Sequence, residues 1–127
     1  MSDGALVREL LEQILLATAR IERRIAPIHG AEDFLADDDG IDRLDATCMM
    51  LIAVGETLKK LDKITGGALL GRHPEVDWAG AKGMRDVISH HDFHIDAELV
   101  DGVCRDRLPG PIQAIRAMRD ELHEPRS

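Results

Sequence analysis

Aromatic residues are scarce in this sequence, which contains no tyrosine, one tryptophan and two phenylalanines. The strands of β-sandwiches and barrels favour aromatic and β-branched side chains, so this scarcity argues against those folds. Apolar residues nevertheless make up 44% of the 127 residues, too many for a disordered chain and too few for a membrane protein. The core must therefore consist of Leu, Ile, Ala, Val and Met side chains, as in a helical bundle.

Cysteines and long apolar runs are also lacking. The two cysteines, Cys48 and Cys104, stand in apolar helical stretches, where cysteine behaves as a small core residue and forms no disulfide framework. The first ten residues have neither the basic nor the apolar region of a signal peptide, and no apolar run approaches the roughly 20 residues that cross a bilayer. We therefore expect a cytoplasmic protein with no membrane partner.

Basic residues are outnumbered, with 16 Lys and Arg against 24 Asp and Glu, which gives a net charge of −8. A protein that depends on non-specific binding to a nucleic acid duplex is normally basic. The overall charge therefore does not attract nucleic acid, and any such contact must be made by a local basic pocket.

Two long segments, residues 5–25 and 41–62, carry apolar residues at three- and four-residue steps, the spacing of amphipathic helices. The second is apolar on more than one face, so we expect it to lie centrally. Gly55 in its middle costs about 1 kcal/mol of helix propensity, which a close approach by a neighbouring helix would justify.

The segments around these helices suggest turns and short helices. Residues 31–35 are expected to form a short helical turn. The acidic run at 37–40 lacks the ligand layout of a calcium loop, so we interpret it as a turn that caps the second long helix. Residues 65–75 are rich in turn-forming types and form the longest connection.

The second half of the chain shows two further helix starts. Asp77 can cap a helix over 78–91, and Asp96 can cap another. The prolines in 109–111 then bend that last helix or divide it in two. The chain is thus predicted to be one all-α domain over residues 1–127, a bundle of four to five helices with a loose tail at 123–127.

Residues whose side chains could take part in catalysis or metal binding concentrate between Met84 and His94. Three of the six histidines stand there: His90, His91 and His94. The simplest interpretation is a helix end, because cationic side chains favour a helix C-terminus and histidine there caps carbonyls. A metal site is a second interpretation, since His90 and His94 share one helical face and Asp92 and Asp96 stand nearby in the sequence. No third ligand has a recognisable spacing and the glutamate of an HExxH motif is absent, so we expect no metal and no cofactor.

A nuclease site is the third interpretation. The imidazole of His90 can take a proton from a ribose 2′-hydroxyl or return one to the leaving oxygen. The guanidinium of Arg85 can grip the phosphate, and Asp86, four residues before His90, can orient the imidazole. On an ideal helix Arg85 and His90 stand about 140° and about 7.5 Å apart. Three arrangements could still bring the two together. The Arg85 side chain bends around the helix toward His90, the helix ends near His90, or a second subunit completes the site.

The Arg85-x4-His90 spacing, preceded by Gly83-Met84 and by HPEVDW at 73–78, resembles the HEPN superfamily and specifically its HepT-like toxin branch. The resemblance extends from about Leu6 to Leu122. It includes VGETLKKL at 54–61, which is similar to the isoleucine-glycine-glutamate-alanine helix of the family.

This resemblance implies an up-and-down helical bundle that forms a homodimer, with two Arg–His motifs in one cleft. It also implies metal-independent endoribonuclease activity on RNA and a partner, a minimal nucleotidyltransferase antitoxin. By position, Arg85 binds phosphate, His90 is the acid/base and Asp86 takes the polar position after the arginine. Glu56 is a further candidate, which either points into the cleft or lies on the helix surface. His91 and His94 either flank the RNA or are solvated.

The sequence departs from the family at Asp92. Many members have a tyrosine there, which their antitoxin modifies with AMP, whereas this chain has no tyrosine at all. Tyrosine AMPylation is therefore excluded, which leaves neutralisation by complex formation, or loss of toxin function. Two functions stay open: a dimeric RNA endonuclease toxin, and a non-catalytic helical module that binds nucleotide or a partner nucleotidyltransferase.

Overall fold

The structure is a computed structural model that describes residues 3–88 and 96–123. Every regular element in these ranges is helical, which confirms the predicted all-α bundle. The elements are α1 (Asp3–Ile25), α2 (Ala31–Leu35), α3 (Asp38–Ile64), α4 (Ala68–Gly71), α5 (Trp78–Lys82), α6 (Met84–Ile88), α7 (Ala97–Gly102), the π-helix η1 (Val103–Arg107) and α8 (Pro109–His123).

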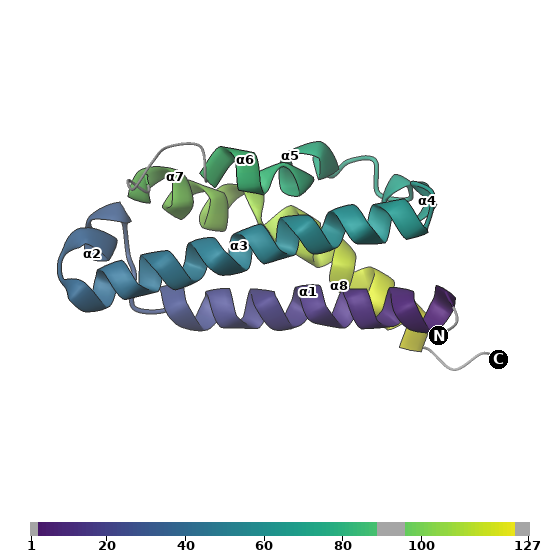
Figure 1. Cartoon of the computed structure of the whole chain (residues 1–127), viewed down its shortest axis with the longest axis horizontal. Helices are drawn as coiled ribbons and strands as arrows, with labels where there is room; N and C mark the ends of the chain where they lie inside the picture. Colours follow the sequence, from purple (N-terminus) through teal and green to yellow (C-terminus); the bar gives the residue numbers. More distant parts are fainter. Residues whose placement is uncertain (1–2, 89–95, 124–127) are drawn as a thin grey trace.

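The chain runs up and down along one long axis (Figure 1). Helices α1 and α3 form a long antiparallel pair, and α8 packs against α1. On the other side of α3 lie α5, α6 and α7, which form a layer of short helices. Helix α3 therefore lies at the centre of the bundle, as its wide apolar surface predicts.

The core forms because the periodic apolar residues of the long helices meet. Leu11 and Ile14 of α1, Leu51 and Leu58 of α3 and Ile115 of α8 are all fully buried. Each such side chain contributes about 1.5–3 kcal/mol by leaving water. Aliphatic side chains thus fill most of the core, as the composition predicts.

Aspartates begin the helices in the way the sequence predicts. The carboxylate of Asp37 accepts a hydrogen bond from the Gly40 N–H at 2.8 Å and so caps α3. Asp77 caps α5 through the Gly80 N–H at 2.9 Å. Asp96 caps α7 in the same way. Asp37 is therefore a helix cap, as expected, whereas residues 38–40 are not a separate turn: they form the first turn of α3, which begins before the predicted start at residue 41.

Two boundaries differ from the prediction. The helix expected over 78–91 is divided at Gly83, whose N–H donates to the Ala79 carbonyl and closes α5 before α6 begins. Within 65–75, where the turn-forming composition predicted only a connection, the structure has the short helix α4. Of the two outcomes left open for the prolines, division is correct: Pro109 and Pro111 stand in the first turn of α8, where a missing N–H costs no hydrogen bond.

Trp78 is buried, and its indole N–H donates to the His73 carbonyl at 3.0 Å. The side chain therefore anchors the start of α5 to the connection that precedes it. In residues 3–88 and 96–123, no helix is long and apolar enough to cross a membrane. The helical backbone of α8 continues to His123, so only residues 124–127 of the expected tail lie outside the described ranges.

Candidate active site

Gly55 brings α3 close to the layer of short helices. A β-carbon at this position would lie 3.0 Å from the Ala81 carbonyl oxygen of α5 and 3.3 Å from the Met84 β-carbon of α6. Only glycine fits this approach without displacing a neighbour. The close approach expected from the sequence is thus confirmed, and it places the next residue, Glu56, beside α6.

Glu56 and Arg85 form an ion pair across this contact. The Arg85 Nη1 lies 3.8 Å from the Glu56 Oε1, and the two side chains are 61% and 40% exposed. An ion pair so open to water contributes at most about 1 kcal/mol to stability. Its consequence is positional: it directs the guanidinium toward α3, and most of the five N–H donors of an arginine stay available for an incoming phosphate.

Lys59 reaches the same carboxylate from one turn further along α3. Its Nζ lies 3.5 Å from the Glu56 Oε1, the atom that Arg85 also contacts. Sequence reasoning missed Lys59, although its spacing of three residues from Glu56 places both on one helical face. Glu56 therefore lies between two cations, one from α3 and one from α6.

A second ion pair ties α5 to α3. The Lys82 Nζ lies 2.7 Å from the Asp62 Oδ2, and both side chains are mostly buried. This contact lies six residues beyond Glu56 on α3 and three residues before Arg85. It fixes the helix that leads into α6.

The remaining predicted site residues divide into two groups. Asp86 is exposed on α6, next to Arg85. His90, His91, Asp92 and His94 lie outside the described residues. Helix α6 is described to Ile88, two residues before His90, so the geometry between Arg85 and His90 remains a prediction.

Comparison with known proteins places the chain in a family. The family model described as "Ribonuclease HepT-like" matches residues 14–118, a range that contains Glu56, Arg85 and His90. The chain belongs to the HepT-like ribonuclease family. The resemblance found in its sequence is thereby confirmed.

One curated relative of this HepT-like chain is a protein of Methanocaldococcus jannaschii named as a putative RNase. The two are 29% identical over 77 residues, which cover 61% of this chain and 60% of the relative. The match thus spans about three-fifths of the relative's length. No solved structure matches the chain.

The sequence predicts no metal centre for this HepT-like chain. Among residues 3–88 and 96–123, no group of three or more His, Cys, Asp or Glu side chains could hold a metal ion. The cluster of His90, His91 and His94 lies outside these ranges, so metal-independent chemistry remains a prediction.

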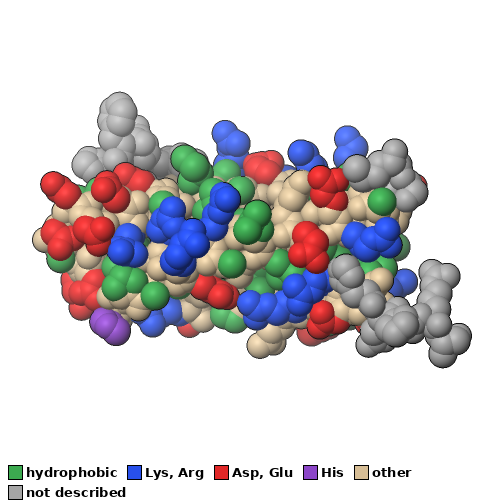
Figure 2. Space-filling view, turned by 90° about the horizontal axis from the view of Figure 1, so that it is seen from below, with side chains coloured by type: hydrophobic (Ala, Val, Ile, Leu, Met, Phe, Trp, Pro, Cys, Tyr) green, Lys and Arg blue, Asp and Glu red, His purple; other side chains and the backbone are tan. Residues whose placement is uncertain are grey.

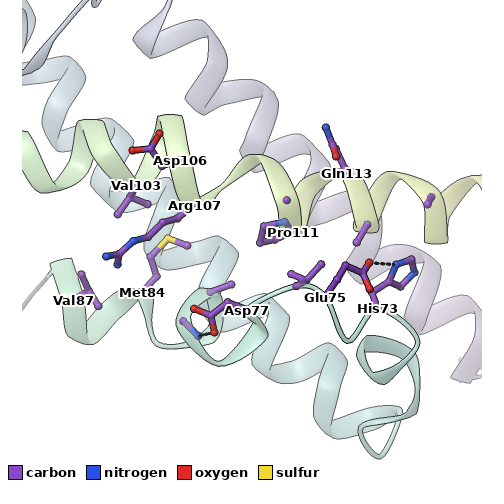
Figure 3. A pocket seen from close by; sticks show the side chains of 16 residues that line it. His73, Glu75, Asp77, Met84, Val87, Val103, Asp106, Arg107, Pro111 and Gln113 are labelled. Atoms are coloured by element: carbon purple, nitrogen blue, oxygen red, sulfur yellow. Dashed lines mark hydrogen bonds and ion pairs between the residues drawn. The ribbon is translucent and has the colours of Figure 1, made fainter.

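A cavity of about 710 Å³ lies on another side of α6 (Figure 3). Met84 and Val87 line it from α6, and Val103 and Arg107 line it from η1. Arg85 does not line this cavity. This cavity is therefore separate from the contact between Glu56 and Arg85.

Proposed function

We propose that this HepT-like chain is a metal-independent RNA endonuclease and the toxin of a toxin–antitoxin module. The observation that carries the proposal is the exposed guanidinium of Arg85, which Glu56 directs toward α3. Arg85 stands five residues before His90, and both residues lie inside the range that the family model matches. An accessible guanidinium beside an acid/base histidine is what metal-free cleavage of RNA requires.

The proposed reaction is a transesterification. The ribose 2′-hydroxyl loses its proton to His90 and forms a new P–O bond to the adjacent phosphate. The bond to the 5′-oxygen breaks, and the protonated imidazole of His90 returns a proton to that oxygen as it leaves. Arg85 stabilises the charge on the phosphorane, and Asp86 orients the imidazole. The products end in a 2′,3′-cyclic phosphate and a 5′-hydroxyl.

A homodimer would supply two such motifs. Met49 of α3 is 67% exposed and stands two helical turns before Glu56 on the same face. A large apolar side chain in water next to the site favours a surface that a second copy covers by two-fold symmetry. In such a dimer, His91 and His94 are candidates to flank the RNA.

The proposed protein partner is a minimal nucleotidyltransferase antitoxin. Asp92 replaces the family tyrosine and the 127 residues include no tyrosine, so neutralisation proceeds through complex formation and not through tyrosine AMPylation. The same substitution and the net charge of −8 favour a second candidate function, a non-catalytic module that binds nucleotide or this partner.

An RNA cleavage assay in EDTA tests the proposal. Wild-type protein should cut RNA and leave 2′,3′-cyclic phosphate ends. Arg85→Ala and His90→Ala should each lower the rate by about 10²–10⁴-fold, because a positioned acid/base and a charge stabiliser each contribute a factor of this size. His94→Ala should have a much smaller effect.

Other results of this assay would contradict the mechanism, the site or the proposed function. Ends that carry a 3′-hydroxyl and a 5′-phosphate would contradict the mechanism, and full activity of His90→Ala would contradict the site. Loss of cleavage in EDTA would restore the metal interpretation. A wild-type protein that cuts no RNA but binds the nucleotidyltransferase would support the non-catalytic module.

A further inference from the structure

We infer that Lys59 is a second phosphate-binding residue of the RNA site, and that Glu56 holds it beside Arg85. This inference rests on the proposed ribonuclease function and adds a substrate contact that neither the Arg–His motif nor the family match assigns.

The geometry places two cations beside the same carboxylate oxygen. The Lys59 Nζ and the Arg85 Nη1 both contact the Glu56 Oε1, at 3.5 Å and 3.8 Å. The two nitrogens therefore lie at most about 7.3 Å apart, the length of the two contacts end to end. Glu56 is thus a positioning residue, because without its charge two like charges this close would repel each other.

Both cations are open to solvent. The Lys59 side chain is 45% exposed and that of Arg85 is 61% exposed, so neither charge must leave the protein interior to meet RNA. The two types complement each other: the planar arginine fork grips one phosphate, while the long flexible lysine stem follows a neighbouring phosphate as a point charge.

The distribution of charge along α3 favours RNA binding at the end of the helix that carries Lys59. Its first eight residues hold four aspartates and one arginine, whereas residues 56–63 hold three lysines, one glutamate and one aspartate. Acidic side chains gather at the end of the molecule where α2 and the start of α3 lie (Figure 2). A polyanion is therefore repelled from that end, and Lys59 lies in the half of α3 that can accept it.

Lys82 does not fill this role, because Asp62 already pairs with it at 2.7 Å and both side chains are mostly buried. Lys60, the next residue on α3, is exposed but points about 100° away around the helix. It is the matched control, since Lys60→Gln removes the same charge from the same helix.

The test measures binding of a 2′-O-methyl RNA oligonucleotide, which cannot be cleaved, over a range of salt concentrations. Each phosphate contact on a single strand adds about 0.7 to the slope of log affinity against log salt. Lys59→Gln should lower this slope by about 0.7 and Lys59→Arg should restore it, whereas Lys60→Gln should leave it unchanged. With cleavable RNA, Lys59→Gln should raise KM and leave kcat nearly unchanged.

Glu56→Gln provides the test of positioning. It removes the charge that holds the two cations, so it should lower kcat/KM of the wild-type chain by several fold but have a smaller effect once Lys59 is replaced by Gln, because Arg85 is then the one cation left to position. Melting temperatures of all variants should match, because the side chains are half-exposed.

The outcomes separate the two proposals. Equal salt slopes for Lys59→Gln and Lys60→Gln, with Arg85→Ala still inactive, would overturn the role of Lys59 and leave the ribonuclease in place. A wild-type chain that neither binds nor cuts RNA would overturn the ribonuclease, and the lysine contact with it. A change confined to the melting temperature would show that Lys59 is only a helix-surface ion pair.

Discussion

Asp62 and Lys82 form a 2.7 Å ion pair that joins α3 to the last residue of α5. Only 25% of the Asp62 side chain and 30% of the Lys82 side chain are exposed, so water screens this pair less than the others that hold the site. The pair therefore sets where α6, and with it Arg85, begins.

Breaking this ion pair should cost more than a surface pair does. Lys82→Met leaves the Asp62 carboxylate without its partner, so we expect unfolding free energy to fall by about 1–2 kcal/mol, between the values for exposed and for buried pairs. Urea unfolding of Lys82→Met, Asp62→Asn and the double variant measures the coupling. Lys63→Met, on the exposed side of α3, is the control and should change little. A coupling of zero would show that the pair is screened like a surface pair.

Gly55→Ala should destabilise the protein although alanine is the better helix former. The new methyl group meets the Ala81 carbonyl at 3.0 Å, and this backbone atom moves only if α5 moves. We expect a loss of about 1–3 kcal/mol, as for other overpacked sites. The control is Gly102→Ala, where a β-carbon meets nothing within 4 Å and should stabilise by about 0.4–1 kcal/mol. Stabilisation by both changes would contradict the close approach.

Thr47→Val should stabilise the protein. Thr47 is fully buried, and within the described part of the chain its hydroxyl has no hydrogen-bond partner. Replacing an unsatisfied hydroxyl by a methyl group of the same shape should gain about 1 kcal/mol. Thr18→Val is the matched control, because the buried Thr18 hydroxyl donates to the Ile14 carbonyl at 2.8 Å and its removal should not stabilise. Equal effects in thermal unfolding would count against this assignment.

The two cysteines should resist alkylation in the folded state. Burial, together with the nearby Asp45 carboxylate, raises the pKa of the Cys48 thiol to about 12. Burial and the Asp101 carboxylate raise the pKa of Cys104 to about 11. Since the thiolate is the reactive form, iodoacetamide at pH 8 should label neither thiol until the protein is denatured.

The same shifts make stability depend on alkaline pH. In the unfolded chain the thiols lose their protons from about pH 9, whereas in the folded chain they keep them to about pH 11–12. The folded state then binds more protons, so unfolding free energy falls with rising pH across this window, by up to about 1.4 kcal/mol per pH unit for each thiol. Replacing both cysteines by alanine should flatten this slope in urea titrations at pH 8–11, and an unchanged slope would refute the assignment.

Met49→Glu should dissociate the proposed dimer. A carboxylate cannot be buried at an apolar interface without a partner, whereas Met49 stands in water in the single chain and its replacement leaves the core intact. Light scattering should give twice the monomer mass of 14.0 kDa for the wild type and the monomer mass for the variant. Leu16→Glu, at an exposed apolar position of α1, should keep the dimer. A monomeric wild type would rule out this interface.

The sequence by itself determines the long helices and the residues that cap three of the helices, because these depend on local interactions. The spacing of Leu11, Ile14 and their neighbours specifies which face of each long helix is buried, and Asp37, Asp77 and Asp96 cap the helices that follow them. The Arg85-x4-His90 spacing and the motifs around it likewise indicate the family, which the match over residues 14–118 confirms. The break at Gly83 and the short helix α4 were not predictable, since both depend on how a connecting segment packs against α3.

Only the tertiary structure decides which charged residues meet. Glu56 and Arg85 are 29 positions apart, and Asp62 and Lys82 are 20 apart, so no local pattern pairs them. They meet because Gly55 lets the backbones of α3 and α5–α6 approach to van der Waals contact. Once the helices are this close, the side chains that border the contact must pair with opposite charge or lose free energy to repulsion. The placement of Lys59 beside Arg85 follows from that packing and could not be read from the chain alone.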